Sequence, residues 1–381
     1  PISDFFKNSE KIFFRLSPDG QYVSYLKPYK GRQNLFIKSL VDGKERMATS
    51  FEDYSVGNYS WTYNNEIIIS QDIIGLDEFK MFALDVPTLN IREIVSLNKG
   101  RIYLVSNPSK QEPDVITIRM NKRDPANFDI YKLNIKTGEL KPYLVNPGNI
   151  TEWFPDDDGK IRLVKASDGV DETILYRPND NTPFKPIIKN NFINRVQPVA
   201  FTGEKNYFYA LSNVNRDKSA LVEIDAETGK EQKVIFACEK ADITRVDYSK
   251  NKHRLELVNC EEEKPHKHFL NADIENMYGA LSKQLHNTQI SIVGRDSAED
   301  KFVIFSYTDI NPGTYYLFER SSGKLTSLGT RNSSINPEEL CTMQPISFKA
   351  RDGLLINGYL TLPKGDRKTR LPVVVLPHDV P

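Results

Sequence analysis

The sequence is poor in cysteine and carries no excess of either charge. Its three cysteines, Cys238, Cys260 and Cys341, are too few and too odd in number for a disulfide framework, and none forms a C-x-x-C pair. We therefore expect isolated thiols in or near strands, although a bridge between Cys238 and Cys260 stays open in an oxidising compartment. Because 51 Lys and Arg balance 51 Asp and Glu, no overall field would hold the chain on nucleic acid, which leaves only a local basic groove for such a partner.

Long apolar runs are missing as well. No stretch approaches the roughly 18 apolar residues of a membrane-spanning helix, so we expect no membrane span. The N-terminal residues lack the charged, apolar and small-residue order of a signal peptide. The chain nevertheless starts at Pro1 rather than Met, which fits either a removed leader or a cloning boundary. We therefore expect a periplasmic or secreted protein rather than a cytoplasmic one, and the sequence leaves the oligomeric state open.

The main positive feature is a repeat of about 46 residues. Similar strand-turn-strand segments end in turn glycines, Gly43, Gly138, Gly229 and Gly323, which are 95, 91 and 94 residues apart. Each gap has room for one further copy, which gives seven units of four strands each, although residues 272–285 in the third gap have helical spacing. Four-stranded units at this period predict an all-β fold, the seven-bladed β-propeller.

The pattern changes after residue 341. Residues 345–363 contain two strands joined by an Asp-Gly turn, which predicts an antiparallel hairpin. A charged linker then leads to residues 373–376 (VVVL), and such an apolar run between prolines is typical of a strand covered on both faces of a parallel sheet. We therefore divide the chain into a propeller at 1–341 and the incomplete beginning of a second domain at 342–381.

This order of elements resembles the prolyl oligopeptidase family of serine peptidases, in particular its dipeptidyl aminopeptidase and acylaminoacyl peptidase branch. The resemblance rests on residues 4–8 (DFFKN), 17–20 (SPDG), 307–317 (YTDINPGTYYL) and 348–378. It implies that the propeller caps an α/β-hydrolase domain whose first strands begin at about residue 342. It also implies two partners, namely short peptide substrates and the chain's own C-terminal hydrolase domain.

The family usually shows His-Gly-Gly-Pro after this strand, in a loop beside the oxyanion hole. The corresponding stretch begins here with His378 and Asp379, and Asp379 and Val380 stand where the family has glycines. The resemblance therefore marks His378 and Asp379 as the oxyanion-loop region, either as a divergent loop or as a distorted chain end.

Acyl transfer by this fold needs a nucleophilic Ser in G-x-S-x-G, followed along the chain by an acid and a His. No G-x-S-x-G occurs in the 381 residues, so we assign no catalytic residue and expect these residues alone to be inactive. The resemblance implies a cofactor-free serine peptidase that hydrolyses short peptides through a Ser-Asp-His triad beyond residue 381, with the propeller limiting entry by size. The alternative is a non-enzymatic propeller that binds a protein or peptide.

The remaining notable residues have structural interpretations. Residues 260–268 (CEEEKPHKH) contain possible zinc ligands, but their Lys and Glu content is typical of a solvated loop, and we assign no metal site. Residues 156–159 (DDDG) coincide with a turn of the repeat and lack the ligand spacing of a calcium loop. We expect Trp61 and Trp153 to pack in the core or between blades, and His253 to lie at the surface.

Overall fold

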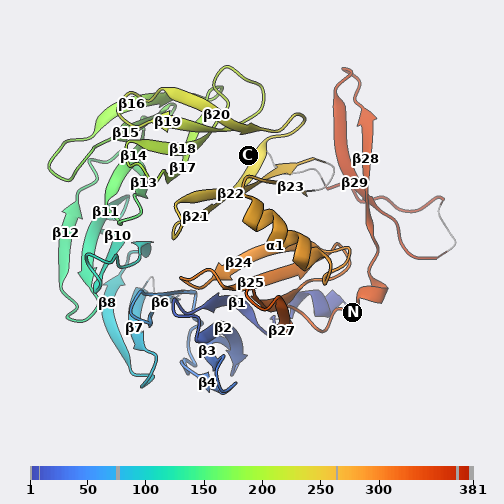
Figure 1. Ribbon diagram of the computed structural model, residues 1–381, viewed down its shortest axis with the longest axis horizontal. Helices are drawn as coiled ribbons and strands as arrows, with labels where there is room; N and C mark the ends of the chain where they lie inside the picture. Colours follow the sequence, from blue (N-terminus) through green and yellow to red (C-terminus); the bar gives the residue numbers. More distant parts are fainter. Residues whose placement is uncertain (1, 8, 74–77, 263–264, 366–368, 377–381) are drawn as a thin grey trace.

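Seven small antiparallel sheets form a ring in the computed structural model of the protein (Figure 1). The structure describes residues 2–7, 9–73, 78–262, 265–365 and 369–376. Each sheet of the ring is built from consecutive strands, and the sheets follow one another along the chain. The fold is therefore the all-β, seven-bladed propeller that the repeat predicts.

The blades are numbered in chain order and are preceded by a short 3-10 helix, η1 (Ile2–Phe6). The strands of blades 1 and 2 are β1 (Ile12–Leu16), β2 (Tyr22–Tyr29), β3 (Arg32–Ser39), β4 (Glu45–Met47), β5 (Asn58–Trp61), β6 (Glu66–Ile73), β7 (Glu78–Asp85) and β8 (Ile91–Asn98). Those of blades 3 and 4 are β9 (Ile102–Ser106), β10 (Val115–Asp124), β11 (Asn127–Asn134), β12 (Leu140–Leu144), β13 (Ile150–Pro155), β14 (Ile161–Ser167), β15 (Glu172–Tyr176) and β16 (Lys185–Asn190). Those of blades 5 to 7 are β17 (Val196–Phe201), β18 (Tyr207–Ser212), β19 (Ala220–Asp225), β20 (Glu231–Ala237), β21 (Ile243–Ser249), β22 (Arg254–Glu261), β23 (Pro265–Phe269), β24 (Gln289–Arg295), β25 (Lys301–Tyr307), β26 (Thr314–Glu319) and β27 (Lys324–Thr330).

The first strand of each blade lies nearest the centre of the ring. β1, β13, β21 and β24 surround the centre in Figure 1, whereas β4, β12 and β16 lie at the periphery. Because side chains alternate across a sheet, each blade presents one set of residues to the preceding blade and the other set to the next. The hydrophobic core consequently lies in layers between blades.

The predicted repeat is confirmed by the backbone of the turns between third and fourth strands. Gly43, Gly138, Gly229 and Gly323 have φ values of 74°, 74°, 69° and 69°. This left-handed conformation costs a residue with a Cβ atom about 1 kcal/mol or more. At Gly229 a Cβ atom would also collide with the carbonyl oxygen of Ile187 in the preceding blade.

Blade 6 has three strands instead of the predicted four, because helix α1 (Ala272–Ser282) occupies the place of the last strand. The side chain of Asn271 caps this helix by accepting hydrogen bonds from the backbone N–H groups of Asp273 and Ile274, at 3.1 and 3.3 Å. Buried residues of the helix, among them Ile274 and Leu281, pack against blade 7. The helical spacing seen in the sequence is thus confirmed.

The ring closes between blades 7 and 1 through side chains. Both blades are built from contiguous segments, and within the described residues no strand passes from one blade to the other. A row of aromatic rings spans the junction: Phe14 lies 4.9 Å from Tyr25 in blade 1 and 4.6 Å from Tyr315 in blade 7. Tyr315 in turn lies 4.7 Å from Phe305. These separations are typical of tilted aromatic pairs, which add attraction beyond the area that they bury.

A separate two-stranded sheet follows the ring. It consists of β28 (Met343–Lys349) and β29 (Leu355–Thr361), which form the predicted antiparallel hairpin, and it projects from the ring in Figure 1. The strand predicted at 373–376 is absent from the structure, where these residues belong to no helix or strand and their side chains are 77–88% exposed. A strand of a parallel sheet needs neighbouring strands and covering layers, and the described part of the chain offers it neither.

We expect the aromatic row to account for much of the stability of the closed ring. Phe14→Ala removes a ring that is 2% exposed and should lower the free energy of unfolding by about 3–5 kcal/mol, measured by equilibrium denaturation in urea. Phe192, which is 81% exposed, provides the control, because Phe192→Ala should change that free energy by about 0.5 kcal/mol or less. Equal effects of the two substitutions would show that closure does not depend on this row.

Candidate functional site

Residues of blades 1, 2 and 7, together with Asn251 of blade 6, line a pocket. The pocket has a volume of about 500 Å³, and its lining combines the rings of Phe13, Trp61 and Tyr315 with the guanidinium groups of Arg15 and Arg295. Aromatic faces can hold the side chains of a peptide, and guanidinium groups can donate to its carbonyl and carboxylate oxygens. We therefore treat this pocket as the candidate site for a peptide.

Phe13 is held in an unusual backbone conformation at this site. Its φ is 54°, in the left-handed region, and the pairing of β1 with β2 is irregular between Ile12 and Arg15. The phenol O–H of Tyr59, from blade 2, donates a hydrogen bond of 2.5 Å to the carbonyl oxygen of Phe13. A bulky residue in this conformation stores strain of roughly 1–3 kcal/mol, and such residues concentrate at binding sites. The result is an aromatic ring turned out of the sheet and into the pocket.

Arg295 is fixed by two buried carboxylates. Its guanidinium donates to both carboxylate oxygens of Glu256 at 2.7 Å and to Glu299 at 3.2 Å. Glu299 also accepts from the hydroxyl of Ser249 and lies 3.3 Å from the ammonium of Lys252. Burial alone would raise the pKa of Glu299, but the hydrogen bond from Ser249 and the charge of Arg295 outweigh it, so the pKa lies below its usual value. This network joins blades 6 and 7 and holds the Arg295 side chain beside the pocket, with its charge balanced by the two carboxylates.

A second contact spans two blades that are not neighbours. Nδ1 of His253, in blade 6, lies 2.6 Å from Oδ2 of Asp157, in blade 4, and the O–H of Tyr248 donates to the same carboxylate at 3.3 Å. The side chain of His253 is half exposed, as expected, but 96 residues separate it from Asp157. No pattern in the sequence indicates this pair, because only the curvature of the ring brings the two turns together.

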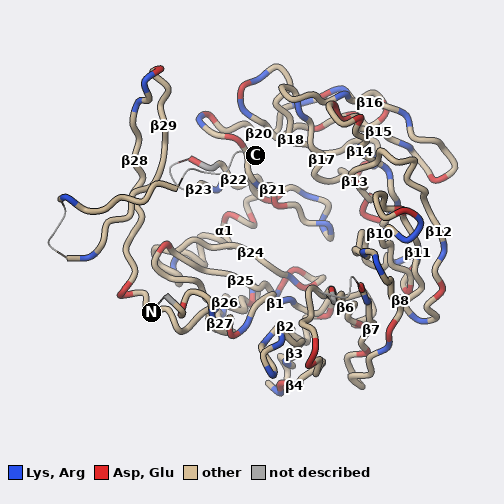
Figure 2. Tube along the Cα trace, turned by 180° about the vertical axis from the view of Figure 1, so that it is seen from behind, with Lys and Arg blue, Asp and Glu red and all other residues tan. Residues whose placement is uncertain are grey.

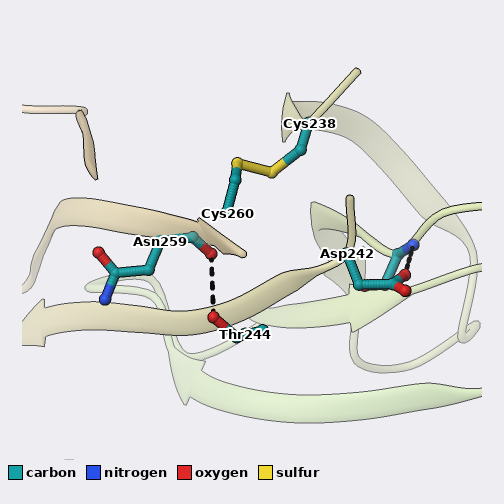
Figure 3. Close-up of a disulfide and its surroundings, with 6 residues drawn as sticks. Cys238, Asp242, Thr244, Asn259 and Cys260 are labelled. Carbon is teal, nitrogen blue, oxygen red and sulfur yellow. Dashed lines mark hydrogen bonds between the residues drawn. A yellow bond between two sulfur atoms is a disulfide. The ribbon is translucent and has the colours of Figure 1, made fainter. Parts of the chain in front are cut away.

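The structure contains a disulfide between Cys238 and Cys260 (Figure 3), so the expectation of isolated thiols is wrong for these two residues. Cys238 follows the rim strand of blade 5 and Cys260 lies in β22 of blade 6, and their Cα atoms are 6.1 Å apart. The bridge that the sequence left open is therefore formed, and it links two blades covalently. Cys341 is the free cysteine.

The disulfide also removes the thiol from the possible zinc ligands. Residues 260–268 are not the expected loop throughout, because His266 and His268 lie in β23, with their rings stacked 4.6 Å apart. Within the part of the chain that the structure describes, no group of three His, Cys, Asp or Glu side chains could hold a metal ion.

Three of the structural interpretations can be checked directly. The carboxylate of Asp156 accepts the N–H groups of Asp158 and Lys160 at 3.0 and 2.9 Å, which confirms the turn. Trp61 is 7% exposed and packs in the cluster between blades 1 and 2, as predicted. Trp153 lines a cavity between blades 3 and 4.

The predicted oxyanion-loop residues, His378 and Asp379, lie outside the described residues.

Figure 2 shows that basic and acidic residues are interspersed around the ring. Among the helices in the described ranges, none is long and apolar enough to cross a membrane.

Two curated relatives align with almost the whole chain. Dipeptidyl aminopeptidase BIII of Pseudoxanthomonas mexicana is 25% identical, over 99% of this chain and 56% of its own length. Dipeptidyl peptidase family member 6 of Caenorhabditis elegans is 23% identical, over 95% of this chain and 51% of its own. A solved prolyl endopeptidase has a similar fold, with a TM-score of 0.68 at 13% identity, over 94% of this chain and 55% of its own. No protein-family model matches the chain, which spans about half the length of the curated relatives.

The disulfide should stabilise the ring measurably. The bridge closes a loop of 22 residues, so replacing both Cys238 and Cys260 by Ala should lower the free energy of unfolding by about 3 kcal/mol. In urea denaturation, a reducing agent should lower the midpoint of the unaltered protein and leave that of the double variant unchanged. Cys341→Ser, which leaves the bridge intact, serves as the control. An unaltered protein whose midpoint does not respond to reduction would contradict the bridge.

The network around Arg295 should make stability dependent on pH. The pKa of Glu299 is lowered in the folded protein. The ionised carboxylate therefore contributes fully to the free energy of unfolding above about pH 4.3, the pKa of Glu in an unfolded chain. This contribution is lost as the pH falls through the lower pKa of the folded protein. Glu299→Gln should therefore lower the free energy of unfolding at pH 7. In urea denaturation at a series of pH values, the gap in this free energy between the variant and the unaltered protein should become smaller below about pH 4.3. The exposed Glu239 provides the control, since Glu239→Gln should have no such effect. A difference that stays constant down to pH 3 would refute this role of Glu299.

Proposed function

We propose that this chain, whose relatives confirm its resemblance to the prolyl oligopeptidase family, is the substrate-gating propeller of a serine peptidase that hydrolyses short peptides. The observation that carries the proposal is the β28–β29 sheet, which lies apart from the seven blades and has an uncovered apolar face. The names of the two curated relatives, both of them peptidases, support the same reaction.

The register of the hairpin defines that apolar face. Ile346, Phe348, Ile356 and Leu360 lie on one side of the sheet, and each is 38–55% exposed. A blade of the propeller would bury such residues against the next blade, and a contiguous exposed apolar surface marks an interface. We therefore assign residues from 342 onward to an α/β-hydrolase domain that covers this face, and residues 1–341 to the propeller.

In this proposal the hydrolase domain carries the reacting groups and the propeller binds the substrate. In the hydrolase domain, Ser attacks the peptide carbonyl, His takes the Ser proton and passes it to the leaving amine, and Asp orients the His. The propeller supplies no reacting group in this scheme. Its role is to admit short peptides and to hold them, with the aromatic ring of Phe13 and the guanidinium of Arg15 as the groups that meet a peptide in the pocket.

We further propose that the protein functions in the periplasm or outside the cell. The Cys238–Cys260 disulfide supports this location, because structural disulfides persist in oxidising compartments and are rare in the cytosol.

Serine-directed labelling tests the peptidase proposal. Residues 1–381 alone should neither react with a fluorophosphonate probe nor cleave dipeptidyl or aminoacyl chromogenic substrates, whereas the chain extended through a complete hydrolase domain should do both. Stoichiometric labelling of the 381-residue chain would contradict the position of the triad. An extended protein that fails to react while still binding peptides would support the alternative, a non-enzymatic binding propeller.

A further inference from the structure

Six of the seven junctions between neighbouring blades contain a buried hydrophobic cluster. These clusters join blades 1 and 2, 2 and 3, 4 and 5, 5 and 6, 6 and 7, and 7 and 1. No such cluster joins blades 3 and 4 among the residues that the structure describes. This junction, which we call the 3–4 junction, is therefore held together differently from the rest of the ring.

The face that blade 3 presents to blade 4 contains several polar residues. In β10, Ile118 and Met120 belong to the cluster shared with blade 2, so the intervening residues Thr117 and Arg119 point the other way, toward blade 4. The partner of Thr117 in β11 is Lys132, which lies on the same face. A Thr, an Arg and a Lys thus lie on this face, beside the fully buried Ile130 that pairs with Arg119 in β11.

The face of blade 4 toward blade 3 is apolar, and a cavity lies beside it. Trp153, Val164 and Leu175 are paired across three neighbouring strands, and all three line a cavity of about 730 Å³. Leu144, from blade 3, also lines this cavity. Side chains beside a cavity lack packing partners on one side, so they lose fewer contacts when the two blades separate.

Several direct contacts across the 3–4 junction are polar. The O–H of Tyr143, in blade 3, donates to the carboxylate of Asp180, in blade 4, at 2.7 Å and accepts from Arg177 at 3.0 Å. Lys160, in blade 4, lies 3.1 Å from the carboxylate of Glu112, in blade 3. Water can replace such contacts as the blades part, whereas exposed apolar surface finds no comparable partner in water.

We propose that the ring opens at the 3–4 junction, which we call the seam because the two neighbouring blades can separate there. Proteins open locally where the least buried apolar surface is exposed. The other junctions are closed by apolar clusters, with the aromatic row added between blades 7 and 1 and the disulfide between blades 5 and 6. The seam is a property of the propeller itself and does not rest on the proposed peptidase function.

Native-state thiol labelling tests the seam. Val164 and Leu163 are adjacent in β14 and are 0% and 1% exposed, but Val164 faces the 3–4 junction and Leu163 belongs to the cluster between blades 4 and 5. In a Cys341→Ser background with the disulfide intact, Val164→Cys should react with a small maleimide at least about tenfold faster than Leu163→Cys. Global unfolding exposes both positions alike, so equal rates, or faster labelling of Leu163→Cys, would overturn the proposal.

A second pair of variants repeats the comparison from blade 3, in case the first pair fails to fold. Thr117 faces the 3–4 junction, and its neighbour Ile116 belongs to the cluster shared with blade 2. Thr117→Cys should again react at least about tenfold faster than Ile116→Cys. Equal rates in this pair would overturn the proposal in the same way.

Filling the cavity should close the seam. Ala166 lines the cavity, so Ala166→Leu should slow the labelling of Val164→Cys severalfold. The matched control is Ala210, which is fully buried in the cluster between blades 4 and 5. Ala210→Leu overpacks a filled junction and should not slow the same reaction. Labelling that is unaffected by Ala166→Leu would count against a seam at this cavity.

Discussion

Apolar packing between successive sheets is the interaction on which the whole ring depends. A sheet of three or four strands cannot cover its own faces, so each blade is stabilised by the blades that pack beside it. For blades 1 and 7, which lie at opposite ends of the propeller in sequence, this requirement is met by the aromatic row through Phe14 and Tyr315. Closing the ring therefore also completes its hydrophobic core. The pocket lined by blades 1, 2 and 7 forms because blades 1 and 7 are held together.

The contacts between neighbouring blades differ from one junction to the next. The differences follow from which side chains of each strand face the neighbouring blade. Between blades 5 and 6 a disulfide supplements apolar contacts, and between blades 6 and 7 the buried network of Arg295, Glu256 and Glu299 does so. Between blades 3 and 4 the alternate residues of β10 are polar and a cavity takes the place of a cluster. A repeat that looks uniform in sequence thus produces a ring in which, among the described residues, one junction lacks the buried apolar cluster that the others contain.

Local features were predictable from the sequence to the extent that their cause is local. The spacing of Gly43, Gly138, Gly229 and Gly323 predicts the blades because each of these turns requires a positive φ, and helical spacing identifies the helix of blade 6. The sequence left the Cys238–Cys260 bridge as an open alternative and gave no sign of the His253–Asp157 contact, because both depend on which strands and turns the ring brings together. The positive φ of Phe13 could not be read from the sequence either. Glycine and asparagine are the residues that usually adopt this conformation, and a phenylalanine gives no indication of it. At 373–376 the composition favours a strand, but composition cannot supply the neighbours that a strand needs.

The hairpin of β28 and β29 also bears on how the protein behaves in concentrated solution. Both of its strands are edge strands within the described sheet, and an edge strand offers unpaired N–H and C=O groups that can extend the sheet into another molecule. Beside these edges lies the apolar face formed by Phe348 and its neighbours. A protein in which this hairpin stays exposed would therefore tend to aggregate by intermolecular strand pairing, and such aggregates would be a property of the hairpin, not a quaternary assembly of propellers.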